Sequence, residues 1–588
     1  MRVAAVNRGR CQPKKCNSEC IRYCPVMKNG TEVIEYGDDG KIIIHEETCT
    51  GCGICVHKCP FGAISIINLP EQLDSDLIHQ YGENGFRLFR LPVPRKGQVV
   101  GILGQNGIGK TSSINILSGN LVPNLGDIDG KPEWDGILER YSGTELGEYL
   151  KKVAAGDIRA ALKPQYVDKL PKAYKGKVGE LLKKVAEKDT DEIVERLNME
   201  NLMDRELSQI SGGELQKAAI AATMVKDADI YFFDEPSSYL DISQRLEIAR
   251  IIRDMARENI VVVIEHDLAI LDFLSDQVHL MYGKAGAYGV IANPRPVRNA
   301  INIYLSGFLP EENMRFRDKE IKFHPHPPKE LRESFVLIRY GALRKSFERF
   351  ELTTSEGQIH QGEVVGVVGP NATGKTTFVK MLAGVLQPDE GWISAEAKVS
   401  YKPQYIKPDY DGTVYDLLWE VLGNFNDNNF FKIEIAHPLR LKDLYERDVE
   451  ALSGGELQRL AIALCLGRDA DIYLLDEPSA YLDAEERMNT SKVIKRVMDK
   501  SGKSAMVVDH DVYLIDMVSD RIMVFGGEPG IKGRAEGPFY MRQGMNRFLK
   551  DVGITFRRDN DTYRPRINKP NSRLDREQRE KGEYYYSE

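Results

Sequence analysis

The stretch GQNGIGKT at residues 104–111 returns 265 residues later as GPNATGKT at residues 369–376. Each copy follows an apolar run, QVVGIL or EVVGVV, that is typical of a buried strand, and each precedes a helical pattern. A glycine-rich loop between a strand and a helix lets successive backbone N–H groups converge on phosphate oxygens. The two stretches therefore predict two phosphate-binding loops in an α/β fold.

These loops are the first of five motifs that occur twice in the same order. The others are KPQY (163–166 and 402–405), SGGELQ (211–216 and 453–458), IYFFDEPSSYLD (230–241) with IYLLDEPSAYLD (472–483), and IEHD (264–267) with VDHD (508–511). Five motifs repeated in order indicate a duplicated domain.

The first copy is longer than the second between two of these motifs. Lys110 and Gln165 are 55 residues apart, whereas Lys375 and Gln404 are 29 apart. Most of the difference falls in residues 133–162, where the pattern predicts two helices separated by a Ser-Gly-Thr break. This insertion is either a surface decoration or a docking element for a large partner.

Composition and motif positions together predict the domain boundaries. The predicted parts are a cysteine-rich module (1–75), a first nucleotide-binding domain (76–290) with a helix-loop-helix insertion at about 134–160, a proline- and charge-rich hinge (291–325), a second nucleotide-binding domain (326–530) and an Arg-rich hinge or tail (531–588).

Each glycine loop should bind the phosphates of ATP together with Mg²⁺. The loop lysines are expected to reach the β- and γ-phosphates, and the following threonines to ligate Mg²⁺ with a carboxylate that ends a strand. The predicted residues are Gly104, Asn106, Gly107, Gly109, Lys110, Thr111 and Asp234 in the first copy, and Gly369, Asn371, Gly374, Lys375, Thr376, Thr377 and Asp476 in the second.

Three side chains in each copy are predicted to act on the attacking water or the γ-phosphate. Glu235 and Glu477 follow the metal-binding carboxylates and are placed to orient and polarise water. Gln165 and Gln404 can reach both Mg²⁺ and water. His266 and His510 follow apolar strand runs and can donate a hydrogen bond to the γ-phosphate.

The SGGELQ segments, between the Gln motif and the Asp-Glu motif, resemble the signature of ABC ATPases. In that family the signature of one domain faces the phosphate loop of the other, so the resemblance implies two composite sites. One would combine Gly104–Thr111, Gln165, Asp234, Glu235 and His266 with Ser453, Gly455 and Asp483. The other would combine Gly369–Thr376, Gln404, Asp476, Glu477 and His510 with Ser211, Gly213 and Asp241.

Aromatic residues upstream of each loop are candidates for stacking on adenine. A loose alignment of residues 80–91 with 339–352 favours Tyr81 and Tyr340, with Phe86 and Phe347 as competitors. Packing in the core explains these aromatic residues almost as well.

Eight of the nine cysteines lie within residues 11–59. The second run is C-x2-C-x2-C-x3-C-P, the spacing of bacterial ferredoxins, in which the fourth cysteine ligates the other cluster. The first run has looser spacing. The crossed rule predicts two 4Fe-4S clusters, one held by Cys49, Cys52, Cys55 and Cys24 and the other by Cys11, Cys16, Cys20 and Cys59. Zinc is the alternative, and Cys465 is expected to be a buried apolar residue.

Bulk properties exclude several classes of protein. The net charge of −8 is incompatible with a globally basic nucleic-acid coat, although local basic patches remain possible. No apolar run is long enough to span a bilayer and the first residues lack an apolar leader, so we expect a cytoplasmic protein.

A ferredoxin-like α+β module followed by two tandem ABC domains resembles the ABC-type ribosome recycling factor of archaea and eukaryotes, the RNase L inhibitor family. The resemblance covers the whole chain and favours an archaeal source. It implies an ATPase that splits ribosomes into subunits after termination or rescue and stays on the small subunit into initiation. The implied partners are the small subunit with its ribosomal RNA and a class-one release factor or Pelota-type relative. The protein is expected to be a monomer in isolation.

Other functions remain open at this point. A redox-coupled ATPase would use the clusters for electron transfer, but no flavin or nicotinamide motif is visible. A transporter subunit would need a separate membrane partner. A translation factor that only remodels a tRNA site would lack the cysteines. Two basic stretches, with seven Lys at 169–188 and seven Arg at 557–579, could contact RNA; the alternatives are a solvated surface and an internal clamp.

Overall fold

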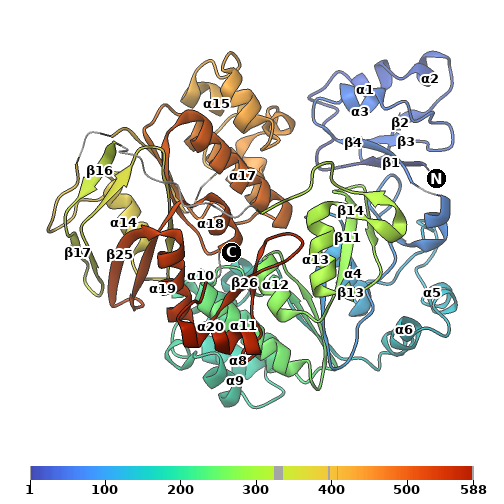
Figure 1. The fold of residues 1–588 in the computed structure, drawn as a ribbon. Coiled ribbons are helices and arrows are strands. Elements are labelled where there is room, and N and C mark those ends of the chain that lie inside the picture. Colours follow the sequence, from blue (N-terminus) through green and yellow to red (C-terminus); the bar gives the residue numbers. More distant parts are fainter. Residues whose placement is uncertain are drawn as a thin grey trace. The chain divides into compact units, whose positions relative to one another are not determined.

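The computed structural model describes residues 2–69, 71–323, 335–394, 397–404, 406 and 408–585 (Figure 1). The chain divides into two compact units. The first consists of Met1–Tyr239, Glu247–His266 and Leu274–Asp318, and the second of Leu240–Leu246, Asp267–Phe273 and Lys319–Glu588. Two short pieces of the first nucleotide-binding sequence therefore pack within the second unit. The predicted boundary at 325/326 lies outside the described residues.

The cysteine-rich module begins the first unit and is a small α+β structure. Strands β1 (Arg2–Val6) and β4 (Ile64–Asn68) pair antiparallel, as do β2 (Ile34–Tyr36) and β3 (Ile42–Ile44). Three short helices, α1 (Glu19–Arg22), α2 (Pro25–Lys28) and α3 (Ile54–Lys58), carry or adjoin the cysteines. Five cysteines are buried with Ala4, Ile34 and Ile64 in one apolar cluster.

A mostly parallel sheet forms the centre of the first nucleotide-binding domain. Its strand order is β5 (Leu77–Gln80), β6 (Arg87–Phe89), β12 (Tyr288–Ile291), β11 (Gln277–Lys284), β7 (Val99–Leu103), β10 (Ile260–Ile264), β9 (Ile230–Asp234) and β8 (Ala160–Lys163), with β13 (Arg295–Pro296) beside β11. The inner strands are buried on both faces, which explains their continuous apolar runs. The carboxyl ends of β7, β9 and β10 meet at one edge, where the motifs follow.

The helices of this first sequence vary widely in length. They are α4 (Lys110–Leu117), α5 (Asp135–Arg140), α6 (Glu145–Ala155), α7 (Leu170–Ala173), α8 (Val178–Val185), α9 (Asp191–Arg196), α10 (Gly212–Met224), α11 (Ile242–Met255), α12 (Leu268–Leu274) and α13 (Val297–Ser306), followed by the strand pair β14 (Phe308–Leu309) and β15 (Met314–Arg315).

Helices α5 and α6 lie where the sequence predicted two helices with a break. Thr144 caps α6 by accepting a hydrogen bond from the backbone N–H of Gly147 at 3.0 Å. Leu146 and Leu150 on the inner face of α6, and Ile137 of α5, belong to the apolar core of the domain. The insertion is therefore packed into the core on one side and exposed on the other.

The second unit repeats the parallel sheet. Its strand order is β17 (Arg344–Ser346), β18 (Glu351–Thr354), β25 (Lys532–Tyr540), β24 (Arg521–Glu528), β20 (Val364–Val368), β23 (Ser504–Val508), β22 (Ile472–Asp476) and β21 (Val399–Lys402); β16 (Val336–Tyr340) and β19 (Gly357–His360) form a separate pair. Its helices include α14 (Lys375–Leu382), α15 (Val414–Leu422), α16 (Gly454–Gly467), α17 (Ala484–Ser501) and α18 (Val512–Val518), with a π-helix at Phe431–Ala436.

The predicted boundary at 530 falls inside this sheet. Strands β24 and β25 form an antiparallel hairpin across it, and Gly530 lies in the turn with a positive φ of 76°. Polar and glycine residues in the hairpin hide its strand pattern. Beyond it, the tail forms α19 (Met541–Val552), the hairpin β26 (Phe556–Arg558) and β27 (Pro565–Ile567), and α20 (Arg573–Lys581).

Candidate ATP-binding and iron-sulfur sites

The two glycine loops have the same local geometry. Helix α4 begins at Lys110 after Gly109, whose φ is 96°, and α14 begins at Lys375 after Gly374, whose φ is 94°. The ammonium of Lys110 donates to the carbonyl of Gly104 at 2.9 Å, and that of Lys375 donates to Gly369 at 2.9 Å. Each loop thus presents a buried ammonium and a helix N-terminus together, as phosphate binding requires.

In the first copy, the carboxylate expected to hold Mg²⁺ lies beside the threonine of the glycine loop. The hydroxyl of Thr111 donates to Asp234 Oδ2 at 3.3 Å. Burial, together with the neighbouring Glu235, raises the pKa of Asp234 to about 6. Asp476 is fully buried, and neither of its carboxylate oxygens has a hydrogen-bond partner among the described residues. A divalent cation fits this donor set, because it would compensate the buried charge.

The structure brings the predicted Gln, Glu and His together in both copies. Gln165 Nε2 donates to Glu235 Oε1 at 2.6 Å, and His266 Nε2 lies 3.6 Å from the same oxygen. In the second copy Gln404 Nε2 donates to Glu477 Oε1 at 2.7 Å, and His510 Nε2 lies at 3.7 Å.

Electrostatics at the second copy suit a proton-accepting glutamate. Burial, with the negative charges of Asp476 and Asp509, raises the pKa of Glu477 to about 7. Burial and the nearby Lys375 hold the pKa of His510 well below its usual range, so this imidazole is neutral. A neutral imidazole can donate one N–H to a phosphate oxygen while the glutamate orients water.

The signature serines cap helices. Ser211 accepts a hydrogen bond from the backbone N–H of Glu214 at the start of α10, and Ser453 does so from Glu456 at the start of α16. Gly213 and Gly455 lie in the first turns, so both helix N-termini have the character of anion sites. Asp483 caps α17 by accepting from the backbone N–H of Glu486 at 2.9 Å.

Asp241 lies within the second unit, next to the second glycine loop. The backbone N–H of Asn371 donates to Asp241 Oδ2 at 2.9 Å. Asp241 comes from the first nucleotide-binding sequence, so this contact joins the two residues that the crossed arrangement assigns to one site.

The aromatic assignment was wrong in the second copy. Tyr340 is only 1% exposed and packs edge-on against Phe378, with ring centroids 5.4 Å apart. Phe347 follows β17 as Tyr81 follows β5, and both side chains are about half exposed. The loose alignment paired Tyr340 with Tyr81 because both precede Gly, whereas the strands fix a different register.

Phe350 is a candidate that the sequence did not single out. A Cβ added at Gly374 would lie 3.0 Å from Phe350, just as one at Gly109 would lie 2.7 Å from Phe86. The ring centroids are 6.4 Å apart in both the Tyr81–Phe86 and the Phe347–Phe350 pair. The signal was its position directly before a strand, the same as that of Phe86.

The eight N-terminal cysteines form two groups of four. Burial raises the pKa of Cys55 to about 12, and the thiols of Cys49, Cys52 and Cys24 add to the shift. Burial raises the pKa of Cys20 to about 11, with contributions from Cys59, Cys16 and Cys11. The members of each group are those of one crossed ligand set, which stays a prediction. Cys465 is buried in α16, as predicted.

No group of three or more His, Cys, Asp or Glu among the described residues has the close arrangement that a single metal ion needs. A mononuclear zinc ion holds its thiolates about 2.3 Å away, whereas a 4Fe-4S cluster spreads its ligands around a larger body. A set of four thiols is a ligand set that a 4Fe-4S cluster uses, and so the residues of each group fit such a cluster.

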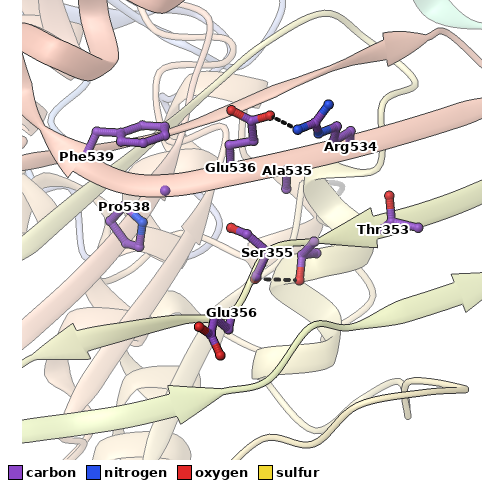
Figure 2. Close-up of a pocket in the computed structure, with 10 residues that line it drawn as sticks. Thr353, Ser355, Glu356, Arg534, Ala535, Glu536, Pro538 and Phe539 are labelled. Atoms are coloured by element: carbon purple, nitrogen blue, oxygen red, sulfur yellow. Dashed lines mark hydrogen bonds and ion pairs between the residues drawn. The ribbon is translucent and has the colours of Figure 1, made fainter.

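A cavity of about 600 Å³ in the second unit is lined by residues from the end of β18 and from the paired strand β25 (Figure 2). Ser355, Glu356, Glu536 and Phe539 line it, and Arg534 pairs with Glu536. None of the predicted nucleotide residues lines this cavity, so it is separate from the ATP sites.

The described helices include none that is long and apolar enough to cross a membrane.

Comparison with known families places each part of the chain. The ABC transporter family matches residues 94–238 and 352–480. The possible Fer4-like domain of RNase L inhibitor matches residues 1–32, and the 4Fe-4S binding domain matches residues 42–65.

Relatives and solved structures match the full length. An uncharacterized ABC transporter ATP-binding protein of Methanocaldococcus jannaschii is 54% identical, over 100% of this chain and 98% of that protein. Translation initiation factor RLI1 of Saccharomyces cerevisiae is 46% identical, again over 100% and 98%. A model of ribosome-bound archaeal Pelota and ABCE1 matches with a TM-score of 0.94 and 55% identity, over 100% of this chain and 99% of that chain. The chain therefore belongs to the RNase L inhibitor family, which joins an iron-sulfur domain to two ABC domains.

Proposed function

We propose that this protein is a twin-ABC ATPase that splits ribosomes into subunits after termination or rescue. The observation that carries the proposal is full-length likeness, at 55% identity, to an archaeal ABCE1 bound to the ribosome with Pelota. A second similar structure, at 55% identity and a TM-score of 0.83, is a recycling factor in complex with a ribosomal stalk protein; it covers 88% of this chain and 100% of that chain. Both halves also retain a full set of ATP-site residues.

In each half, the assigned residues support ATP hydrolysis. The loop lysine and helix N-terminus bind phosphate, and Thr111, Asp234 and Gln165, or Thr376, Asp476 and Gln404, would hold Mg²⁺, which would neutralise charge on the phosphates. Glu235 and Glu477 orient water, assisted by His266 and His510.

ATP drives the cycle by shifting a population of conformations. A nucleotide that touches the phosphate loop of one domain and the signature of the other favours the closed state by its greater affinity for that state. Hydrolysis removes the γ-phosphate contact with the signature serine and permits opening. Closure is proposed to move the iron-sulfur domain, which then acts on the ribosome.

Two 4Fe-4S clusters are proposed, one for each group of four cysteines. When bound, they would stiffen the module without taking part in electron transfer. A module of about 70 residues that two clusters hold rigid can transmit force. We therefore assign the clusters a mechanical role and not a role in a redox-coupled ATPase.

The partners are the small ribosomal subunit and a class-one release factor or Pelota-type rescue factor. Such a factor works in the cytoplasm, stays on the small subunit into initiation and is a monomer in isolation. The Lys-rich stretch 169–188 remains a candidate RNA contact, with Lys169 and Lys184 lying over exposed or half-exposed tyrosine rings. The tail is less suitable, because Arg558, Arg564 and Arg566 are engaged with buried carboxylates.

Sedimentation of ribosomes tests this function. Ribosomes incubated with the protein, release factor and ATP should separate into subunits, and the Glu235→Gln, Glu477→Gln variant should not turn over. Splitting that proceeds fully with the clusters held redox-inert would support a mechanical role. Intact ribosomes under all conditions would contradict the proposal.

A further inference from the structure

Two buried side chains outside the proposed chemistry hold the main chain of the first water-orienting glutamate. Lys163 Nζ donates to the carbonyls of Asp234 and Glu235 at 2.8 and 3.1 Å. Gln216 Nε2 donates to the carbonyl of Glu235 at 2.7 Å. Both side chains are 0% exposed. Burying an amine and an amide so deeply is unfavourable unless their donors are used, and here they are used on the two successive carbonyls of Asp234 and Glu235.

The second copy repeats the arrangement. Lys402 Nζ donates to the carbonyls of Asp476 and Glu477 at 2.7 and 3.3 Å, and Gln458 Nε2 donates to that of Glu477 at 2.7 Å. Both contacts recur where the same motifs recur, so the arrangement belongs to the duplicated site.

The glutamates need such support, because their backbone is in an unfavourable conformation. Glu235 has a φ of 50° and Glu477 a φ of 49°, in the left-handed region that disfavours residues with a Cβ. The N–H of Glu235 donates to Ile264 at 2.9 Å, and that of Glu477 donates to Val508 at 2.8 Å. Because its N–H and its carbonyl are both hydrogen-bonded, the backbone of each glutamate is fixed and can hold the carboxylate in one direction.

The glutamines also connect two motifs. Gln216 lies on α10, whose N-terminus is the first signature, and Gln458 lies on α16, whose N-terminus is the second. In the crossed arrangement each signature serves the ATP bound by the other domain, whereas each glutamine contacts the glutamate of its own domain.

We propose that Lys163 with Gln216, and Lys402 with Gln458, are positioning residues that fix the water-orienting glutamates. Each glutamine therefore links a signature helix, whose N-terminus serves one ATP site, to the water-orienting glutamate that serves the other ATP site. The second statement rests on the crossed sites of the proposed function; the first does not.

Steady-state ATP hydrolysis without ribosomes tests the positioning role. The pair Gln216→Met, Gln458→Met keeps side-chain size and removes the donors, whereas Gln216→Lys, Gln458→Lys keeps a donor. We expect the Met pair to lower kcat about tenfold with KM for ATP changed less than about twofold, and the Lys pair to recover most of the rate. Thermal unfolding checks that both pairs are folded. Wild-type kcat in the Met pair, or no recovery in a folded Lys pair, would overturn the role. Failure to split ribosomes would not affect this readout.

A double-mutant cycle tests the connection between sites. Ser211→Ala should cost at least about threefold less in kcat when Gln216→Met is already present, because both residues act along α10. The matched control, Ser211→Ala with Lys163→Met, removes a contact to the same glutamate from β8 instead of α10 and should be additive. Additive effects in the cycle with Gln216→Met as well would refute the connection.

Discussion

Tyr340 and Phe347 separate packing from ligand contact at the scale of single residues. Tyr340 is a core residue, whereas Phe347 is about half exposed and stacks on Phe350, which lies against Gly374 of the second glycine loop. Tyr340→Ala should therefore lower the free energy of unfolding by about 3–4 kcal/mol, as for other buried aromatic residues.

Phe347→Ala should change stability little but raise KM for ATP about tenfold, since stacking of an aromatic ring on a base contributes about 1–3 kcal/mol. Nucleotide titration and thermal unfolding of the two variants side by side provide the measurement. A raised KM in Tyr340→Ala alone would restore the sequence-based assignment.

Asp272 is a third residue whose role can be measured. Burial alone would raise its pKa, but Arg564 and Arg566 outweigh burial and hold the pKa below its usual range. Its contribution to stability is therefore present above the unfolded pKa of about 3.9 and is lost as pH falls through the lower, folded pKa. At neutral pH, Asp272→Asn should destabilise by about 3 kcal/mol, because fully buried Arg564 loses the negative charge of its ion-pair partner.

Chemical denaturation at pH 7 and at pH 3 measures this effect. The difference between wild type and Asp272→Asn should shrink at the lower pH. Leu574→Ala, at an exposed position of α20, is the control for changes in the tail itself.

Among the elements, the short helices of the first module depend on their cysteines. Cys24 is the residue before α2, yet its thiol belongs with Cys49, Cys52 and Cys55. Cys24→Ser should remove the cluster held by that group, so the iron and labile sulfide content should fall by about half. Cys465→Ser, in α16, should leave the iron content unchanged. An unaltered iron content in Cys24→Ser would argue against crossed ligation.

The insertion helices require a different test from simple deletion. Removing α5 and α6 would expose the core residues that pack against Leu146 and Leu150. The exposed face of α6 carries Lys151 and Lys152. Lys151→Glu with Lys152→Glu should weaken co-sedimentation with the small subunit, most strongly at low salt, while ATP hydrolysis stays unchanged. Equal binding by the variant and the wild-type protein would show that this face of α6 does not contact the small subunit.

At the scale of the whole molecule, the sequence predicted what depends on local motifs. The loops, signature serines and cysteine groups have fixed spacings, so their elements and neighbours could be anticipated. The hairpin across residue 530 could not, because glycine and polar residues mask its alternation. Lys163 and Gln216 belong to the repeated motifs, but the sequence did not indicate their role. That role depends on which backbone carbonyl each side chain reaches, and only the fold determines this.

The crossed pairing of the two ATP sites is the last prediction. If Ser453 serves the ATP bound by the loop at 104–111, then Ser453→Arg and Glu235→Gln disable the same site, and combining them should slow phosphate release no more than one alone. Ser453→Arg with Glu477→Gln disables both sites and should abolish release. Ser211→Arg should behave in the opposite way, being redundant with Glu477→Gln and additive with Glu235→Gln. Phosphate release by the four double variants decides the matter, since pairing within each domain would exchange the two results. The contact between Asn371 and Asp241 favours the crossed outcome, because it already joins the second loop to a residue of the first domain's sequence.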